Sequence, residues 1–384
     1  MLDCKRHLFS IPDDVVFFNA AAWSPLPQPS VEAGQKAMLL KANPWDMQPG
    51  ADEAEFERAR TAAASVINAE NGDIALIASV GYGVSTAAKI LDLPAGSKIL
   101  ALDNDHSSPV LEWMTRPAGQ ELRVEFVKPD ESRDWTSAVL DHLERAKGDP
   151  PALLSISSIQ WSDGGVIDLN LVQAELKARG IKLLVDATHE VGVVPVDVKE
   201  LDPDFLIFPT YKWLLGPYGR SFLYVAKRHQ DGIPLEQTSY ARKRVVAEDD
   251  QHFTDLNYID SARRFDMGER DFFVSLRVAS TSIELVHSWG AAEIRDRLQM
   301  LTNRIEEGLL DRQVPVTMLE RKLRSPHILS LGFPNGMPAD FENVLRSRRV
   351  FAAPRLGRLR LSPHVYNNED DCDRLVDELA NILR

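Results

Sequence analysis

The stretch "LLVDATHEVGVVPVDVKELDPDFLIFPTYKWLLGPYGRSFLYV", residues 183–225, holds the clearest fold signal in the chain. It covers nearly all of three short apolar runs, at 182–187, 204–208 and 220–226, which are typical of strands buried on both faces of a parallel sheet. Asp186 ends the first run, and Lys212 follows the second. The stretch therefore predicts neighbouring buried strands whose polar residues gather at one edge of the sheet.

Four further apolar runs precede this stretch, at 73–79, 98–103, 122–127 and 152–157. Amphipathic segments lie between the runs, and the clearest are 52–68 and 169–180, the second of which ends in glycine as helices often do. Such alternation predicts an α/β fold with a mostly parallel, seven-stranded sheet.

The sequence pattern changes near residue 275. We expect one long helix over about 275–311, then a β-rich stretch with "HILSLGF" and "GRLRLSPH", and a last helix, "NEDDCDRLVDELANILR". This predicts a large α/β domain over 15–275 and a smaller α+β domain over 276–384, with residues 1–14 packing near the smaller one.

Composition narrows the range of functions. The formal charge of −13 argues against nucleic-acid and membrane-surface partners, which require basic patches. Cys4 and Cys372 lie far apart with no metal-ligand spacing, so we expect neither a disulfide nor a metal site. The N-terminus lacks an apolar core of signal-peptide length, and no apolar run reaches about 18 residues, which predicts a cytoplasmic protein.

The segment "SVGYGVSTAAK" follows the first predicted strand of the sheet. Gly81 and Gly83 there could present backbone N–H groups to a phosphate at the start of a helix, or could simply form a strand–helix turn. A dinucleotide site is a further alternative, because Asp103 lies twenty residues after Gly83, although Thr86 stands where a third glycine is usual.

Three other side chains are expected at the same sheet edge. His106 could stack on a flat ring, relay a proton or be an ordinary loop residue. Asp186 would need a cation, such as a protonated pyridine nitrogen, unless it caps a helix. Lys212, flanked by apolar residues, is either a poorly solvated nucleophile or a lysine that reaches the surface. Together these groups fit pyridoxal phosphate.

These motifs resemble the class V aminotransferase family of fold-type I pyridoxal-phosphate enzymes, which includes cysteine desulfurases, kynureninases and isopenicillin-epimerase-like proteins. The resemblance runs from "VVFFNAAAWSPLP" to "LRLSPHVYNNEDDCDRLVDEL", nearly the whole chain. Its most specific part is the Asp-x-x-His motif, the following strand, the lysine and Gly-Pro-x-Gly. The resemblance implies a homodimer, with "RRFDMGER" (263–270) contributing a phosphate contact across the interface.

The resemblance also implies residue roles. Lys212 would form the Schiff base and move the Cα proton of the substrate, Asp186 would keep the ring nitrogen protonated, and His106 would stack on the ring. The remaining implied cofactor contacts are His189, Tyr82, Gly83, Gln160, Thr210 and Tyr211. Arg360 would bind the α-carboxylate of an amino-acid substrate, beside Asn19 and Ala20 in an N-terminal loop.

The reaction implied is that of an amino acid held as an external aldimine and passing through a Cα carbanion. A transaminase is the first expectation, with a β-eliminating C–S lyase or an epimerase as alternatives. No cysteine lies between Val350 and Arg360, where desulfurases of this family carry one, and we expect Cys372 on a surface helix. A NAD-dependent oxidoreductase and a non-catalytic homologue stay open. Basic residues at 242–244 would suit an acidic substrate or belong to a solvated loop.

Overall fold

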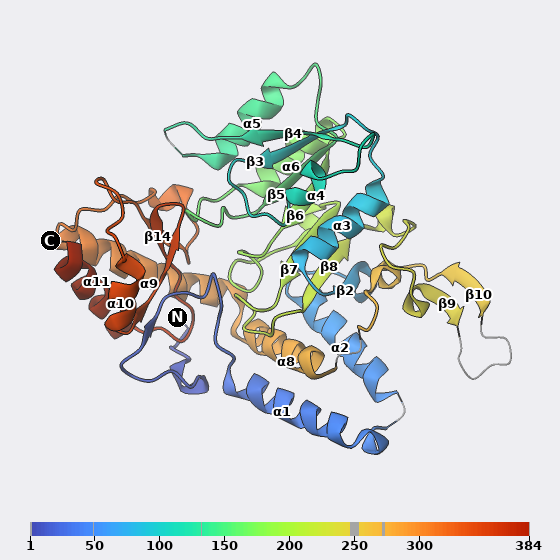
Figure 1. Cartoon of the computed structure of the whole chain (residues 1–384), viewed down its shortest axis with the longest axis horizontal. Helices are drawn as coiled ribbons and strands as arrows, with labels where there is room; N and C mark the ends of the chain where they lie inside the picture. The colour runs from blue at the N-terminus through green and yellow to red at the C-terminus, as the bar shows by residue number, and fades with distance from the viewer. Residues whose placement is uncertain (1, 49, 132, 246–252, 271–272, 384) are drawn as a thin grey trace.

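The computed structural model describes residues 2–48, 50–131, 133–245, 253–270 and 273–383. Its centre is a seven-stranded sheet with the order β2-β8-β7-β6-β5-β3-β4 (Figure 1). The strands are β2 (Ile74–Ile77), β3 (Lys98–Leu102), β4 (Arg123–Val127), β5 (Leu153–Ser157), β6 (Lys182–Asp186), β7 (Phe205–Pro209) and β8 (Ser221–Val225). All seven predicted strands are confirmed, and β8 is the one that runs against its neighbours.

Six of the seven strands are buried on both faces, because their successive side chains enter different apolar clusters, whereas the edge strand β4 is partly exposed. Leu183 and Val185 of β6 belong to one cluster with Val172 of α6 (Leu169–Ala178), whereas Leu184 belongs to the other with Val84 of α3 (Val80–Leu91). Alternation with a period of two places these residues on opposite faces. The continuously apolar runs in the sequence reflect this double burial. The sheet is also accompanied by α4 (Leu111–Met114), α5 (Trp135–Arg145) and α7 (Val198–Leu201).

The C-terminal region forms a separate, antiparallel sheet with the order β11-β14-β13. The elements of the C-terminal region are, in chain order, α9 (Ala291–Asp311), β11 (Leu329–Leu331), α10 (Phe341–Ser347), β12 (Val350–Phe351), β13 (Ala353–Arg355), β14 (Arg358–Leu361) and α11 (Glu369–Leu383). The N-terminal segment joins this region, since β1 (Val16–Phe17) pairs with β12 and the Lys5 amide donates to the Val365 carbonyl at 2.7 Å. The N-terminal segment and the C-terminal region therefore pack as one unit.

The predicted single helix over 275–311 is wrong. The structure has two helices, α8 (Phe273–Trp289) and α9, which are separated at Gly290. Gly290 has a φ of 81°, a left-handed conformation that favours glycine and that cannot continue a helix. α8 packs against α1 (Gln28–Ala42) and α2 (Ala51–Ser65), whereas α9 packs against α11. The break therefore redirects the chain from the large sheet to the C-terminal region.

A hairpin of β9 (Arg242–Val245) and β10 (Phe253–Tyr258) projects from the side of the large sheet opposite the C-terminal region (Figure 1). The basic residues at 242–244 belong to β9, and residues 246–252 lie outside the described residues. Within the described residues, no helix is both long and apolar enough to cross a membrane.

Candidate active site

Two adjoining cavities lie at the carboxyl edge of the parallel strands. One, of about 490 Å³, contains Asp186 and the start of α3, and the other, of about 470 Å³, contains Asn19 and Arg360. Both are lined by His106, Tyr211, Lys212 and Tyr218. Because parallel strands end at the same edge, residues distant in sequence meet here. Lys212 thus faces two compartments, each large enough for a small ligand.

Lys212 is buried, with 6% of its surface exposed. Its Nζ lies 3.2 Å from Nε2 of His189. Burial, reinforced by the positive charge of Arg360, lowers the pKa of the Lys212 ammonium to about 7. A substantial fraction of the amine is therefore unprotonated and nucleophilic at neutral pH. The prediction of a poorly solvated lysine agrees with this environment.

His189 is held in one tautomer by Trp213. The indole Nε1–H of Trp213 donates to Nδ1 of His189 at 3.3 Å, so the proton of the neutral imidazole lies on Nε2 and faces Lys212. Burial lowers the pKa of His189 well below its ordinary value, which keeps the ring neutral. His189 can therefore donate a hydrogen bond to the free amine of Lys212.

Asp186 lies at the end of β6 and is 3% exposed. Its Oδ1 accepts a hydrogen bond from the Thr188 amide at 3.0 Å, and it has no ion-pair partner among the described residues. A buried carboxylate with a single amide donor is under-compensated. A cationic ligand group in the first cavity would supply the missing partner.

His106 lines both cavities and is held by its own loop. The Ser108 hydroxyl lies 3.2 Å from Nδ1 of His106, and the Asp105 carboxylate accepts from the His106 amide at 2.7 Å. Asp105 also accepts from the amide and hydroxyl of Ser157, at 2.9 and 2.6 Å. Burial lowers the pKa of His106, so its ring is a neutral, flat wall of the cavity.

The start of α3 offers an anion site with a different set of amides from the one predicted. The amides of Tyr82 and Gly83 donate to the hydroxyl and carbonyl of Ser79, at 3.1 and 3.2 Å. Ser79, Val80 and Gly81 line the first cavity, whereas Tyr82 and Gly83 do not. The first amides of a helix have no partner within it, so those of Val80 and Gly81 could bind an anion in the first cavity.

Gly83 has a packing role instead. A Cβ at this position would lie 2.9 Å from Cδ1 of Ile77 and 3.0 Å from Cδ1 of Ile207, so only glycine lets α3 approach the sheet this closely. Tyr82 directs its hydroxyl to Glu236, which together with burial raises the pKa of the phenol. Neither residue is placed as a direct phosphate ligand.

Thr210 and Tyr211 precede the lysine but act differently. The Thr210 hydroxyl donates to the Pro217 carbonyl at 2.6 Å, and Thr210 does not line either cavity. It fixes the 216–219 loop, where a Cβ on Gly216 would lie 2.6 Å from Cβ of Thr210. Tyr211 lines both cavities and stacks on Tyr218 with ring centroids 3.8 Å apart. Tyr211, rather than Thr210, can therefore contact a ligand.

Arg360 is brought to the second cavity by β14 and is 2% exposed. Its Nη1 donates to the Trp161 carbonyl at 2.6 Å, while its Nε is a buried donor with no hydrogen-bond partner among the described residues. Burial, together with the charge of Arg355, lowers the pKa of Arg360 to about 9. The cavity therefore holds a buried cation that its own chain leaves partly unsatisfied.

The N-terminal loop contributes a second polar atom to this cavity. Oδ1 of Asn19 is buried and has no hydrogen-bond partner in the part of the chain that the structure describes. Ala20 is fully buried and does not line the cavity, whereas Ala21 and Ala22 do. Asn19, rather than Ala20, is therefore placed to contact a ligand.

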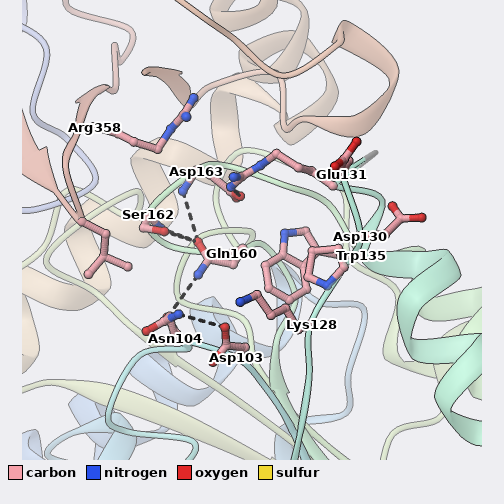
Figure 2. Close-up of a pocket in the computed structure, with 13 residues that line it drawn as sticks. Asp103, Asn104, Lys128, Asp130, Glu131, Trp135, Gln160, Ser162, Asp163 and Arg358 are labelled. Carbon is pink, nitrogen blue, oxygen red and sulfur yellow. Dashed lines mark hydrogen bonds and ion pairs between the residues drawn. The ribbon is translucent and has the colours of Figure 1, made fainter. Parts of the chain in front are cut away.

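The placement of Gln160 beside the cofactor is not supported. Its Oε1 accepts from the Ser162 amide at 2.6 Å and the Asp163 amide at 3.1 Å, and its Nε2 donates to the Asn104 carbonyl at 3.1 Å. Gln160 lines a third cavity, of about 690 Å³, as Figure 2 shows. Its neighbour Trp161 lines the cavity of Arg360 instead. The loop thus directs Trp161, and not Gln160, towards the cavity that contains Arg360 and Lys212.

The same third cavity contains Asp103 (Figure 2), whereas Gly81 lines the first one. A dinucleotide site would need the acidic residue and the glycines around one ligand. The geometry of Gly81 and Asp103 therefore gives no support to the dinucleotide alternative.

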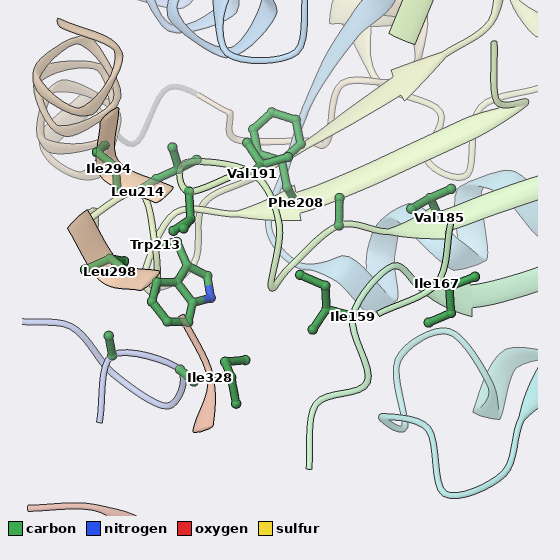
Figure 3. Close-up of a cluster of buried hydrophobic side chains, with 14 of the residues drawn as sticks. Ile159, Ile167, Val185, Val191, Phe208, Trp213, Leu214, Ile294, Leu298 and Ile328 are labelled. Carbon is green, nitrogen blue, oxygen red and sulfur yellow. The ribbon is translucent and has the colours of Figure 1, made fainter. Parts of the chain in front are cut away.

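The apolar flank of Lys212 belongs to the main core of the protein (Figure 3). Trp213 is 1% exposed, and Ile294 and Leu298 of α9 belong to the same apolar cluster. The Trp213 carbonyl accepts from Nε2 of His364 at 3.1 Å. These contacts fix the indole that orients His189.

Several residues of the site are not among those that the sequence predicts. They line the two cavities or hold the residues that do, and they are Trp161, Tyr218, Trp23, Arg355, Ser108, Thr188 and Asp105. For Arg355 the sequence does contain a signal. A two-residue turn at Leu356 and Gly357, both with positive φ, joins β13 to β14 and places Arg355 and Arg360 on the same face of the hairpin.

The basic residues at 242–244 do not support the predicted contact with an acidic substrate. Arg242 stacks on Tyr258 at 4.0 Å and Lys243 pairs with Asp260 at 2.8 Å, and neither basic residue lines a cavity with Lys212. The side chain of Arg244 lies outside the described residues. The basic loop therefore gives no support to an acidic substrate.

The 263–270 segment is also engaged elsewhere. Its Asp266 is bound by Arg60 and Arg270, and the segment does not line the cavities of Lys212. A contact from this segment to a phosphate of a second subunit stays a prediction.

Cys372 is not on a surface. It lies on the buried side of α11, is 0% exposed and contacts the Leu301 carbonyl at 3.7 Å, and burial raises the pKa of its thiol. α11 is amphipathic and its apolar side faces α9. Cys372 is one of the residues on that apolar side, which accounts for its burial.

The two cavities suit pyridoxal phosphate on the chemistry of their own residues. The first combines a nucleophilic amine, an under-compensated carboxylate and helix-start amides. It also contains the buried hydroxyl of Thr188, which has no hydrogen-bond partner within the described ranges. The second supplies a buried guanidinium for a carboxylate. These are the groups that a cationic ring, a phosphate and an amino acid would each satisfy.

Known proteins share this architecture. Residues 15–375 match the family described as Aminotransferase class-V. The chain is 25% identical to the uncharacterized aminotransferase YcbU of Bacillus subtilis (strain 168), covering 98% of this chain and 96% of that protein. It is 28% identical to the isopenicillin N epimerase of Streptomyces clavuligerus, and the alignment covers 95% of this chain and 94% of that protein. A cysteine desulfurase structure from Thermococcus onnurineus NA1 superposes with a TM-score of 0.85 at 20% identity. The superposition covers 100% of this chain and 99% of that one.

Proposed function

We propose, from the premise that this chain belongs to the aminotransferase class-V family, that it is a pyridoxal-phosphate-dependent aminotransferase acting on a small amino acid. The observation that carries the proposal is the position of Lys212, a buried amine with a pKa of about 7 between a cavity with Asp186 and a cavity with Arg360. An amine in that position can serve a cofactor on one side and a substrate on the other.

When bound, pyridoxal phosphate supplies an aldehyde that condenses with amines and a ring that accepts electron density from the substrate. The amides of Val80 and Gly81 would hold its phosphate, and Asp186 would hold its ring nitrogen in the protonated form. His106 would lie against the ring as a neutral wall.

Lys212 and His189 are suited to proton transfer. The neutral amine of Lys212 can take a proton from the substrate Cα, and the Nε2–H of His189 keeps that amine oriented. The fixed tautomer of His189 prevents it from competing for the proton, because its other nitrogen already accepts from Trp213. Arg360 would bind the α-carboxylate and so set the position of Cα, with Asn19 beside it.

We also propose a cytoplasmic homodimer. Both cysteines are free, which suits a reducing compartment. Met38, Leu39 and Trp45 are 58%, 65% and 78% exposed, and such a group of exposed apolar side chains on and after α1 favours a subunit interface. Light scattering on the eluted protein would test the dimer, and a mass of one chain, 43.0 kDa, would contradict it. We further propose that residues 15–275 and 276–384 are the two domains.

The cofactor assignment is tested by spectroscopy. We expect the purified protein, incubated with pyridoxal phosphate, to show a visible absorption band that borohydride removes. Lys212→Ala should lack the band and lose activity by about 10³- to 10⁴-fold, since one residue acts both as nucleophile and as base. A protein that binds no pyridoxal phosphate would refute the proposal.

The reaction type is tested with amino acids and oxo acids. A transaminase produces a new amino acid only when an oxo-acid acceptor is present, and converts the cofactor to its amine form without one. Release of ammonia together with pyruvate in the absence of an acceptor would instead indicate a β-eliminating lyase, and inversion at Cα would indicate an epimerase.

A further inference from the structure

The cavity that contains Arg360 has an unusual charge balance. Two arginines, Arg355 and Arg360, line it, and none of its described lining residues is an aspartate or a glutamate. The whole chain, by contrast, has a formal charge of −13. The positive charge is therefore local, and its position beside Lys212 ties it to the substrate.

Two arginines reach this cavity from one hairpin. In the pairing of β13 with β14, Arg355 is opposite Arg358, and Arg360 is two residues further along on the same face. Diagonal neighbours on one face of an antiparallel pair lie about 7–8 Å apart at the backbone. Their long side chains can therefore hold two anionic groups of one small molecule.

Neither guanidinium has an ionic partner in the part of the chain that the structure describes. Arg360 makes one hydrogen bond through Nη1 and leaves Nε without a partner, and Nη1 of Arg355 donates to the Pro354 carbonyl at 2.7 Å. A single carboxylate on Arg360 would leave the charge of Arg355 in place. A second anionic group would neutralise both arginines.

We propose that this site accepts a dicarboxylic amino acid or oxo acid, with the α-carboxylate on Arg360 and the distal carboxylate on Arg355. This inference rests on the proposed function and adds the substrate class. The planar fork of a guanidinium binds a carboxylate through two parallel hydrogen bonds, which makes Arg355 a specificity-determining residue. The basic loop at 242–244 has no part in it.

The test compares succinate with butyrate. The two acids have the same number of carbon atoms, but succinate has two carboxylates and butyrate has one. Binding of each to the purified protein is measured by isothermal titration calorimetry, with and without pyridoxal phosphate. We expect succinate to bind about 10- to 100-fold more tightly than butyrate. Equal binding of the two acids would overturn the inference.

Arg355→Gln should remove the preference for succinate, while Arg355→Lys should retain part of it. Arg358→Gln is the matched control, because Arg358 lies on the same hairpin but lines the third cavity. It should keep the preference. Thermal melting of each variant shows that the protein is folded. If Arg355→Gln weakens both acids equally, both arginines serve one carboxylate and the inference is wrong.

The same variants separate this inference from the proposed function. With pyridoxal phosphate bound, Arg355→Gln should lower the rate of cofactor conversion at least about tenfold more with aspartate or glutamate than with alanine. Equal losses for all three amino acids would overturn the inference and leave an aminotransferase. A protein that binds no cofactor yet prefers succinate would overturn the proposed function alone.

Discussion

Two clusters of buried charge in this protein differ in how they are compensated. At the edge of the large sheet, Asp186, Lys212 and Arg360 form no ion pair with a described residue. Near the start of β2, Asp266 binds both Arg60 and Arg270, and its Oδ1 also accepts from the Leu76 amide at 2.9 Å. In both clusters charged groups have been removed from water, which is unfavourable. Only in the second cluster do ion pairs within the chain offset this desolvation.

The direction of the pKa shifts expresses the same difference. Burial alone would lower the pKa of Arg60, yet the carboxylates of Asp266 and Glu57 raise it. For Arg360, burial and the nearby Arg355 lower the pKa to about 9. A buried charge that is satisfied by the protein stabilises the fold, whereas one that is left unsatisfied favours a ligand.

The largest expected effect is on stability, at the compensated cluster. Asp266→Asn removes the buried carboxylate and leaves Arg60 and Arg270 only the more exposed carboxylates of Glu57 and Glu53, which should lower the free energy of unfolding by about 3–5 kcal/mol. Urea denaturation followed by circular dichroism measures it. A change below about 1 kcal/mol would mean that the two clusters do not differ as described.

The same substitution at the other cluster should affect catalysis instead. Asp186→Asn keeps the hydrogen bond from Thr188 possible but cannot hold a ring nitrogen in its protonated form, so activity should fall about 10²- to 10³-fold. Stability without cofactor should change by less than about 1 kcal/mol, because no ion pair is broken. Equal losses of stability in Asp186→Asn and Asp266→Asn would remove the distinction between the clusters.

The smallest effect is a pH dependence of stability in the protein without cofactor. Lys212 loses its proton near pH 7 in the folded chain, whereas an unfolded lysine keeps it until about pH 10.5. Unfolding takes up a proton between these values, so the free energy of unfolding should rise with pH, by about 2 kcal/mol from pH 7 to pH 9. Lys212→Ala should lack this rise. An identical rise in the variant would assign it to other groups.

The sequence is sufficient to predict the sheet and part of the site. All seven strands are predicted, and six of them are buried on both faces, so that each of the six is an apolar run that can be recognised without knowing its partner strands. Lys212, Asp186 and His106 follow or end such runs, and the carboxyl ends of parallel strands meet at one edge. For these residues, position along the chain implies position in space.

Other residues of the site could not be placed in this way. Gln160 and Trp161 are neighbours, and only the path of their loop decides which one faces the cavity of Arg360. Thr210 and Gly83 stand in motifs typical of phosphate ligands, yet a hydrogen bond to Pro217 accounts for the first and close packing against β2 for the second.

The break between α8 and α9 is a further feature that the sequence pattern conceals. Apolar and polar residues alternate with helical spacing on both sides of Gly290, so the pattern predicts one helix. The interruption depends on the left-handed backbone conformation of that single residue.

By itself, the sequence determined the buried strands, the chemically active residues at their ends and the family to which the motifs point, because these depend on local patterns of burial. Only the tertiary structure decided which charges have partners. Asp266 and Asp186 are both buried aspartates, and what separates them is whether arginines from other parts of the chain reach the carboxylate. Compensation of a buried charge is a property of the packed molecule, since it depends on distances between segments that the sequence leaves unspecified.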